Sequence, residues 1–193
     1  VKRYTHVVYG LGYIVTREEL EDNQYEKVSR RRSKALAFSI RQTEEIVGAN
    51  ILNRAFNTSY TGGDGKALIV SDHVTVNGSQ SNVLAVAADF SEASLEDLII
   101  QAMNATNSRG LKISIMPRKL IVAPANAFNA ERVLKSTLRS ASPNNDINAV
   151  RSMGMLPDGV VVNHYLTDTD AWFLLTDIPN GLKMFQRKAM TTG

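Results

Sequence analysis

The sequence predicts an α+β protein, because helical and strand-like segments are mixed along the chain without strict alternation. The first observation behind this prediction is a long stretch, residues 17–56, that has no proline, one glycine and apolar residues at helical spacing. The second is a pair of shorter helical patterns that begin after Ser91 and Asn126. The third is a set of short apolar runs bounded by turn residues, which indicate strands.

The first predicted element is a strand over residues 4–15, where aromatic and β-branched residues are frequent and Gly10 and Gly12 loosen the strand. Thr16 follows at a position typical of a helix N-cap. Glu19, three residues later, completes a capping box. The sequence therefore predicts that an extended segment leads directly into a helix.

The next element is the longest, and we predict one helix from about Arg17 to about Phe56. Its apolar face holds Leu36, Ile40, Val47, Ile51 and Ala55. At about 1.5 Å per residue this helix would be about 60 Å long, whereas a compact domain of this size is roughly 35 Å across. We therefore expect the helix to protrude or to span two lobes. The alternative is two shorter helices, broken near Ser33 or Gly48.

The remaining elements are shorter. Asn77-Gly78 predicts a hairpin turn. Ser91 is expected to cap a helix that ends near Asn104, and Asn126 is expected to cap another helix. The core face of that last helix is predicted to be Phe128, Val133, Leu134 and Leu138. Strand-like runs lie at residues 67–70, 111–115, 120–122, 160–166, 171–176 and 182–186, with a polar loop at 140–148.

Composition excludes several classes of protein. The chain has 193 residues, 44% hydrophobic and 21% charged, which is ordinary for a globular protein that can bury a core. It has no cysteine, which excludes disulfides and thiolate metal sites and favours a reducing compartment. No stretch approaches the roughly 18 apolar residues of a membrane helix, so we expect no membrane partner. No signal peptide is recognisable, and because Val1 replaces an initiator methionine we expect a processed or trimmed piece of a longer chain.

The charge of the chain is modest but unevenly placed. Residues 1–60 carry ten basic and seven acidic side chains, and this third accounts for the whole net charge of +3. A surplus of this size is too small for a dedicated nucleic-acid binder. The candidate functional side chains are Arg30, Arg31 and Arg32, which can meet phosphates or an acidic patch on a neighbouring subunit. The alternative is a solvated helix face.

The sequence offers little for catalysis. Ser71-Asp72-His73 suggests a catalytic triad, but side chains so close in sequence rarely face one another, and no Gly-x-Ser-x-Gly motif is near. We expect a loop histidine there. His164 and Trp172 lie in apolar strand-like runs, so packing in the core or, for His164, at an interface is the natural interpretation. We assign no catalytic residue.

No metal or cofactor site is expected either. Asp168 and Asp170 could touch calcium, but the loop lacks the remaining ligands of an EF-hand, and a solvated turn is expected. The run from Thr61 to Lys66 is rich in glycine but does not have the spacing of a phosphate-binding loop, and it follows a helix rather than a strand. A flexible connector is the better interpretation.

Several phrases of the sequence resemble the major capsid (head) proteins of tailed bacteriophages. The first is YTHVVYGLGYIVTREELEDNQY, with a long helix ending in ANILNRAFN. The second is FSEASLEDLIIQAM and then LKISIMPRKLIVAPANAFNAERVLKS, which is similar to the family's axial-domain pattern of helix, strand and helix. The third is GVVVNHYLTDTDAWFLLTDIPNGLKMFQRK, which is similar to the next strands. Within the family, the Mu-like prophage major head subunits are the branch that the chain resembles.

This resemblance implies the tailed-phage capsid fold. Residues 1–15 would be the end of an extended loop, 16–90 a peripheral domain with a long spine helix and a connector, 91–181 a mixed α/β axial domain, and 182–193 the start of the return to the peripheral domain. The family usually has an N-terminal arm before the loop and a final strand after the return, so we expect both ends to be incomplete.

The resemblance also implies a function. The chain would be a structural protein without enzymatic activity that self-assembles as hexamers and pentamers into the icosahedral head. Its partners would be copies of itself, packaged double-stranded DNA bound without sequence specificity, and scaffold, portal or decoration proteins. Residues 4–15 would lie over a neighbouring subunit, loops such as 140–148 would meet around the symmetry axis, and the protein would belong to the virion after assembly in the bacterial cytoplasm.

Three alternatives stay open. An encapsulin-like bacterial nanocompartment shell would share the fold, so fold alone does not separate it from a viral head. A hydrolase using Ser71 or His73 is the second alternative. A virion component other than the capsid subunit, such as a decoration or portal-associated protein, is the third.

Overall fold

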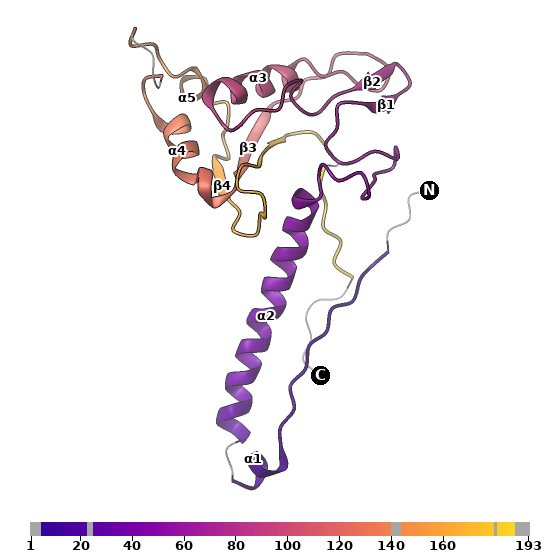
Figure 1. Ribbon diagram of the computed structural model, residues 1–193, viewed down its shortest axis with the longest axis vertical. Coiled ribbons are helices and arrows are strands. Elements are labelled where there is room, and N and C mark those ends of the chain that lie inside the picture. Colours follow the sequence, from indigo (N-terminus) through magenta and orange to yellow (C-terminus); the bar gives the residue numbers. More distant parts are fainter. Residues whose placement is uncertain (1–4, 23–24, 140–143, 180, 188–193) are drawn as a thin grey trace. The chain divides into compact units, whose positions relative to one another are not determined.

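The computed structural model describes residues 5–22, 25–139, 144–179 and 181–187 (Figure 1). Helices and strands are mixed, which confirms the α+β class. The chain divides into two compact units, one formed by Val1–Gly48 with Leu182–Gly193 and the other by Ala49–Gly181. The predicted loop at 140–148, the turn at 178–181 and the end of the chain after residue 187 fall partly outside the described residues.

Two helices occupy the stretch that was predicted to be one. α1 spans Arg17–Glu21, and α2 spans Tyr25–Asn53, 29 residues and so about 43 Å of helix. Asp22 is the C-cap of α1, with φ −78° and ψ 4°. The single-helix prediction is therefore wrong, and so is the alternative of a break near Ser33 or Gly48. The physical reason lies at Asp22, because aspartate and the asparagine after it in sequence are weak helix formers whose side chains compete for backbone hydrogen bonds.

The start of α1 is as predicted. The Glu19 backbone N–H donates to Thr16 Oγ1 at 3.3 Å, and the Thr16 N–H donates to Glu19 Oε2 at 3.2 Å. This reciprocal pair is the capping box, and it satisfies backbone donors that a helix N-terminus otherwise leaves unpaired.

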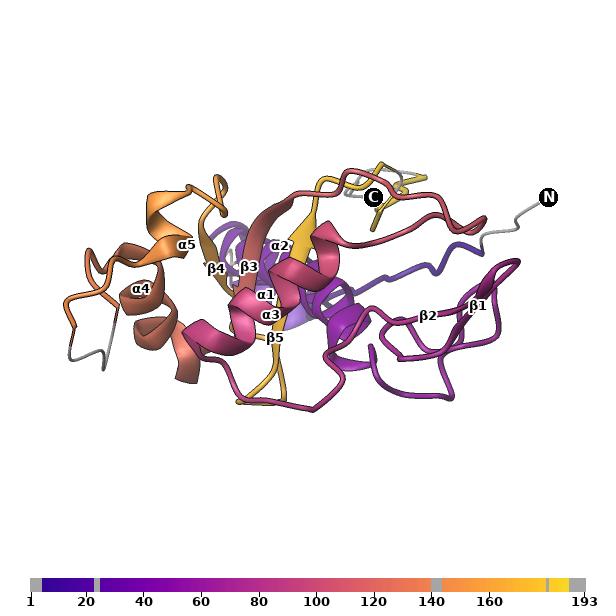
Figure 2. The ribbon, with the colours of Figure 1, turned by 90° about the horizontal axis from the view of Figure 1, so that it is seen from above.

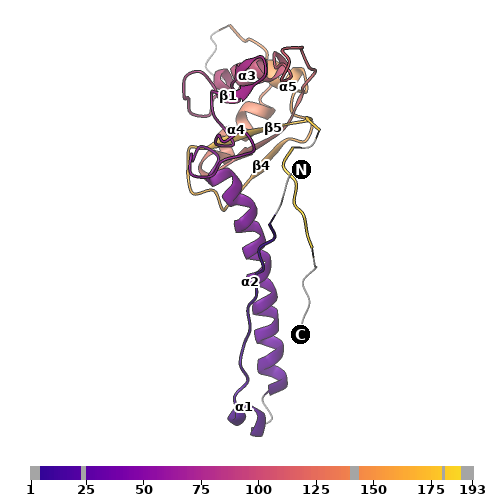
Figure 3. The same ribbon diagram turned by 90° about the vertical axis from the view of Figure 1, so that its right-hand side faces the viewer.

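The segment before α1 is extended but is not a strand. Residues 5–15 run alongside α2, and no ladder pairing is present among them (Figures 1 and 3). The strand prediction is wrong here because a strand needs a neighbour to accept and donate its backbone hydrogen bonds. Composition alone, with Gly10 and Gly12 inside the run, does not supply that neighbour.

A three-stranded sheet organises the unit Ala49–Gly181. Its order is β4 (Val160–Val162), β3 (Pro117–Val122) and β5 (Trp172–Thr176), with β3 parallel to β4 and antiparallel to β5. Successive side chains of a strand point to opposite faces. In β3 this sends Leu120 and Val122 to one face and Ile121 to the other, so the central strand is apolar on both sides.

One face of the sheet packs against helices. These are α3 (Glu92–Met103), α4 (Ala127–Lys135) and α5 (Ala149–Ser152), and Figure 2 shows α3 across the sheet. The buried residues of this core are Phe90, Leu95, Ile99, Leu120, Val122, Ala130, Val133 and Val150. Trp172 joins them edge-on to Phe90, with ring centroids 5.5 Å apart, and its indole N–H donates to the Ala88 carbonyl. The prediction that Trp172 packs in the core is confirmed.

The other face of the sheet packs against the last residues of α2 and the chain just after it. Phe173 and Ile121 contact Leu52 and Ala55 there. The amide of Asn53 adds two polar ties, because it donates to the Tyr165 carbonyl and accepts from the Thr167 N–H. This end of α2 is thereby part of the folded core of the unit.

The predicted apolar face of α2 is only partly right. Ala49, Leu52 and Ala55 are buried, whereas Val47 and Ile51 are exposed by 38% and 45%. The sheet accounts for the burial of Leu52 and Ala55, because Phe173 and Ile121 pack against them.

The hairpin prediction at Asn77-Gly78 is confirmed. β1 (His73–Thr75) and β2 (Gly78–Gln80) pair antiparallel, with Thr75 opposite Gly78. Gly78 has φ 114°, a backbone conformation that glycine tolerates and L side chains rarely adopt. The Asn77 N–H also donates to the Ser108 carbonyl, which ties the hairpin tip to the turn after α3.

The ends of the later helices were predicted unevenly. Ser91 caps α3 in a capping box completed by Ser94, and Asn104 is the C-cap of the helix, in agreement with the predicted end near Asn104. Asn126 makes no side-chain cap, because a short 3₁₀ turn, η1 (Pro124–Asn126), precedes α4. The core face predicted for α4 is wrong at Phe128 and Leu138, which are exposed by 78% and 46%.

Several predicted strands are absent or shorter. Residues 67–70, 111–115 and 182–186 form no strand, and the run from 160 ends as a strand at Val162. Residues 111–115 make one isolated bridge, between Lys112 and Thr106. These runs are apolar in sequence, but within the described residues no neighbouring strand pairs with them.

We expect Leu120→Ala to lower the free energy of unfolding by about 2–5 kcal/mol, because the side chain is fully buried between β3 and the helices. Val161→Ala, on the neighbouring strand and 42% exposed, is the matched control and should change it by less than about 1 kcal/mol. Urea denaturation followed by circular dichroism measures both. Equal losses would contradict the position of the core.

Candidate functional site

A charged clamp holds the extended segment against α2. Arg32 donates from Nη1 to the Ile14 carbonyl at 2.7 Å and to Glu19 Oε2 at 2.8 Å, and from Nη2 to Glu19 Oε1 at 2.6 Å. One guanidinium thus binds both oxygens of a carboxylate and a backbone carbonyl, which is strong and directional hydrogen bonding. Tyr13 adds a hydrogen bond between its hydroxyl and Ser33 Oγ, at 3.1 Å. We call Arg32, Glu19 and Ile14 the Arg32 clamp.

Hydrogen bonds in and beside the clamp lower the pKa of Glu19 and of Tyr13. The hydrogen bonds from Arg32, and after them that from the Thr16 backbone, hold the pKa of Glu19 below its usual value. The hydrogen bond with Ser33 lowers the pKa of Tyr13 in the same way. Glu19 is therefore a carboxylate at neutral pH, and the clamp is formed under those conditions.

The segment held by the clamp is apolar and uncovered. Its most exposed apolar side chains are Val8 at 91%, Ile14 at 83%, Val7 at 69%, Leu11 at 59% and Tyr9 at 56%. We call residues 7–15 the apolar segment. A contiguous run of exposed apolar residues marks an interaction surface. The segment is therefore held by polar contacts at Tyr13 and Ile14, while its apolar side chains remain exposed.

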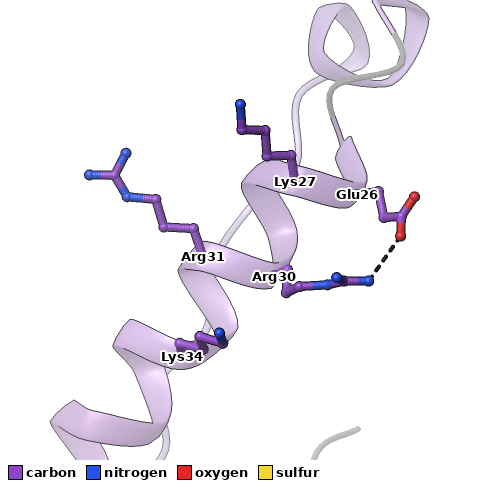
Figure 4. A pocket seen from close by; sticks show the side chains of 5 residues that line it. All are labelled: Glu26, Lys27, Arg30, Arg31 and Lys34. Atoms are coloured by element: carbon purple, nitrogen blue, oxygen red, sulfur yellow. Dashed lines mark hydrogen bonds and ion pairs between the residues drawn. The ribbon is translucent and has the colours of Figure 1, made fainter.

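Of the three consecutive arginines, Arg32 is separated from the other two. Arg32 is turned into the clamp, whereas Arg30 donates to Glu26 at 3.0 Å on the open surface. Arg31 extends beside Lys27 and Lys34 (Figure 4). A helix turns by about 100° per residue, so Arg32 lies about 100° around α2 from Arg31 and about 200° from Arg30.

A different set of side chains shares one face. Glu26, Lys27, Arg30, Arg31 and Lys34 line a shallow open hollow on the N-terminal part of α2 (Figure 4). We call the four cations among them, Lys27, Arg30, Arg31 and Lys34, the basic face. Lys27 and Lys34 were missed in the sequence analysis because it followed the run of arginines, although the spacing i, i+3, i+4, i+7 from Lys27 would have found the face.

The serine–aspartate–histidine run does not form a triad. His73 Nδ1 lies 2.6 Å from Asp64 Oδ2, whereas the Asp72 carboxylate pairs with Lys66. The contact with His73 lowers the pKa of Asp64. His73 Nε2 is buried and makes no hydrogen bond, so it has no nucleophile to activate among the described residues.

These contacts also organise the glycine-rich loop. The Gly62 N–H donates to the Lys66 carbonyl at 2.7 Å, and the Lys66 N–H donates to Asp64 Oδ1 at 3.1 Å. With Asp64 held by His73, the loop is a closed turn tied to β1. The loop is thus internally hydrogen-bonded, and its role as a connector stays a prediction.

The other candidate ligands stay apart. Asp168 accepts from the Asp170 N–H at 3.0 Å in an exposed turn, as predicted for a solvated loop. His6 and His164 are both exposed, so the prediction of core packing for His164 is wrong within the single chain. In the part of the chain that the structure describes, no three histidine or carboxylate side chains gather as a metal site would require. No helix within those ranges is long and apolar enough to cross a bilayer.

Comparison with known proteins adds one finding. The model of a family described as phage capsid protein matches residues 1–190. No curated protein and no solved structure matches the chain. The family match includes the Arg32 clamp, the apolar segment and the basic face.

We expect the segment before α1 to loosen in acid. The pKa of Glu19 is lower in the folded chain than in the unfolded one, so its carboxylate stabilises the clamp fully above about pH 4.3 and progressively less as the pH falls through its folded pKa. Amide hydrogen exchange of residues 14–20, measured across this range, should show protection falling with pH more steeply than intrinsic exchange explains.

The matched variant for this prediction is Glu19→Gln, which keeps the shape and removes the charge. It should show reduced protection at neutral pH and no acid transition in this segment. Glu18→Gln is the control, because the ion pair of the clamp is made by Glu19 and not by Glu18, and this variant should behave as the unmodified chain. An acid transition that survives in Glu19→Gln would contradict the assignment.

Proposed function

This chain belongs to the phage capsid protein family, and from that premise we propose that it is the subunit whose copies assemble into the head that encloses double-stranded DNA. The family is structural, and its members belong to the virion. The resemblance noted in the sequence is thus confirmed at the level of the family. The Mu-like branch within it stays a prediction.

The observation that carries self-assembly is the apolar segment. In the single chain the side chains of Val8 and Ile14 are exposed to water by 91% and 83%. The Arg32 clamp meanwhile holds the backbone of the segment at Ile14. Burying such side chains against a neighbour is favourable by about 25 cal/mol per Å² of apolar surface. Because the segment is already held, less conformational entropy is lost when the neighbour binds.

The geometry of the shell follows from the type of contact. The apolar segment of one copy would cover a different surface of the next, which makes the contact heterologous. Heterologous contacts close into rings when the rotation allows, and we propose hexamers and pentamers that together form an icosahedral head. Many modest contacts acting together make such a shell stable.

The roles of the chain's parts follow the family resemblance. We propose that residues 1–15 end the extended loop, that 16–90 form the peripheral domain with α2 as its spine helix, that 91–181 form the axial domain and that 182–193 begin the return. The loop at 140–148 would meet its copies around the symmetry axis. Scaffold, portal and decoration proteins would be further partners, and assembly would take place in the bacterial cytoplasm.

A structural role agrees with the side chains described. His73 contacts Asp64. Within the described residues no serine is hydrogen-bonded to His73, so the hydrolase alternative lacks its nucleophile–base pair. The encapsulin-like alternative shares the proposed assembly and differs in what the shell contains. The contents of the particles therefore separate the two.

Negative-stain electron microscopy of the protein purified from expressing cells is the test of assembly. We expect closed regular shells, or hexameric and pentameric rings, with DNA inside shells that form during phage growth. DNA-free shells loaded with protein would favour the nanocompartment. A monomer at every salt concentration and pH tested would contradict the proposal.

Val8→Asp tests the apolar segment itself. A buried, unpaired carboxylate is costly, so this variant should remain folded by circular dichroism but form no shells. Val76→Asp is the matched control, because Val76 is also 91% exposed but lies at the tip of the β1–β2 hairpin. Shells from Val8→Asp as abundant as those from the control would remove the apolar segment from the interface.

A further inference from the structure

The basic face of α2 has a charge surplus that the rest of the chain does not share. Residues 25–34 hold five cations and one carboxylate, a surplus of four, whereas the whole chain has a surplus of three. Arg32 is one of the five and is neutralised by Glu19 in the clamp. The surplus on the open side of the helix therefore comes from Lys27, Arg30, Arg31 and Lys34.

These four cations are poorly compensated. All four are exposed. Arg30 pairs with Glu26, but both side chains are more than 70% exposed, and an ion pair in that setting contributes little. Lys27, Arg31 and Lys34 have no ion pair with any described residue. A surface with this much uncompensated positive charge attracts anions.

The chemistry of the face favours phosphate over a protein partner. The described residues that line the hollow are all charged. The centre of a protein interface is depleted of charged residues, lysine in particular, and enriched in aromatic and apolar ones. The apolar segment has that character and the basic face does not. Arginine and lysine without an apolar centre are typical of contacts to a phosphate backbone.

The spacing of the cations fits a polyanion. Lys27 to Lys34 spans seven residues, or about 10 Å along the helix. Duplex DNA presents one charge per roughly 1.7 Å of its axis, so about six phosphates lie within that length. Among the residues that the structure describes, no side chain lining the hollow offers the amide or aromatic groups that read bases, so we expect binding that does not depend on sequence.

We propose that the basic face binds the phosphate backbone of duplex DNA without sequence specificity. Lys27, Arg30, Arg31 and Lys34 each contribute a phosphate contact, and Arg32 contributes none because its guanidinium is held by Glu19 and Ile14. This inference deepens the proposed function and rests on it for the identity of the DNA, which is the genome inside the shell. The chemistry of binding depends only on the side chains of the face.

The experiment measures binding of a fluorescent duplex of arbitrary sequence to the unassembled full chain by anisotropy, over a series of salt concentrations. For the unmodified chain we expect the logarithm of the association constant to fall with the logarithm of salt with a slope of about −3 to −4, since each phosphate contact contributes about −0.9. The triple variant Lys27→Ala, Arg31→Ala, Lys34→Ala should reduce the size of that slope by roughly 2.7 and lower affinity more than tenfold at low salt. Alanine, lysine and arginine are all good helix formers, so circular dichroism should be unchanged.

The control removes the same charge elsewhere. Arg109, Arg151 and Arg187 are exposed and lie outside α2, and their triple alanine variant should keep the slope of the unmodified chain. Equal losses in the two triple variants would overturn the proposal, because net charge rather than the face would then explain binding. Absence of DNA binding by the unmodified chain would overturn it too.

Two further measurements separate the possible partners and the two proposals. Poly-glutamate that binds the unmodified chain while duplex DNA does not would overturn the phosphate assignment in favour of an acidic protein surface. Electron microscopy of the same proteins reads assembly independently. Shells from the basic-face variant that retain less DNA would support the inference. Failure of the unmodified chain to form shells would contradict the proposed function and leave the anisotropy result to decide the basic face.

Discussion

The structure depends on a central strand that is apolar on both sides. In β3, Leu120 and Val122 face a layer of helices, while Ile121 faces the end of α2. The same strand therefore contributes to two hydrophobic clusters, one on each face of the sheet. A strand in this position must be covered on both faces, because neither face can be left to water. The requirement explains why α3, α4 and α5 lie on one side and why Leu52 and Ala55 are buried while Ile51 is exposed.

A second constraint acts on the other unit, where polar contacts take the place of a core. The Arg32 clamp gives the extended segment a fixed course without burying its apolar side chains. Hydrogen bonds and a bidentate ion pair can do this at a helix surface because their geometry is directional, whereas apolar contacts need an enclosed volume. The segment therefore has a backbone held by hydrogen bonds and apolar side chains exposed to water. A subunit that has not yet bound its neighbour in an assembly is expected to have such a segment.

Local signals predicted local structure well. The capping box at Thr16, the N-cap at Ser91 and the hairpin at Gly78 depend on residues within a few positions of one another, and each is present as predicted. Signals that need a distant partner were less informative. The run 4–15 has the composition of a strand but no strand pairs with it, and Phe128 has the spacing of a core residue but lies open. For the candidate site, the arginine run pointed to the correct turns of α2, but only the helix geometry separated Arg32 from the basic face.

By itself the sequence determined the α+β class, the starts of α1 and α3, the absence of thiol chemistry and the resemblance to phage capsid proteins, because each depends on residue type and short-range spacing. Only the tertiary structure decided which side of α2 is buried, that His73 pairs with Asp64 rather than Ser71, and that Arg32 binds Glu19 while its neighbours remain open. The reason is that burial and ion pairing are set by atoms brought together across the fold. Residue type and short-range spacing in the sequence do not show which atoms these are.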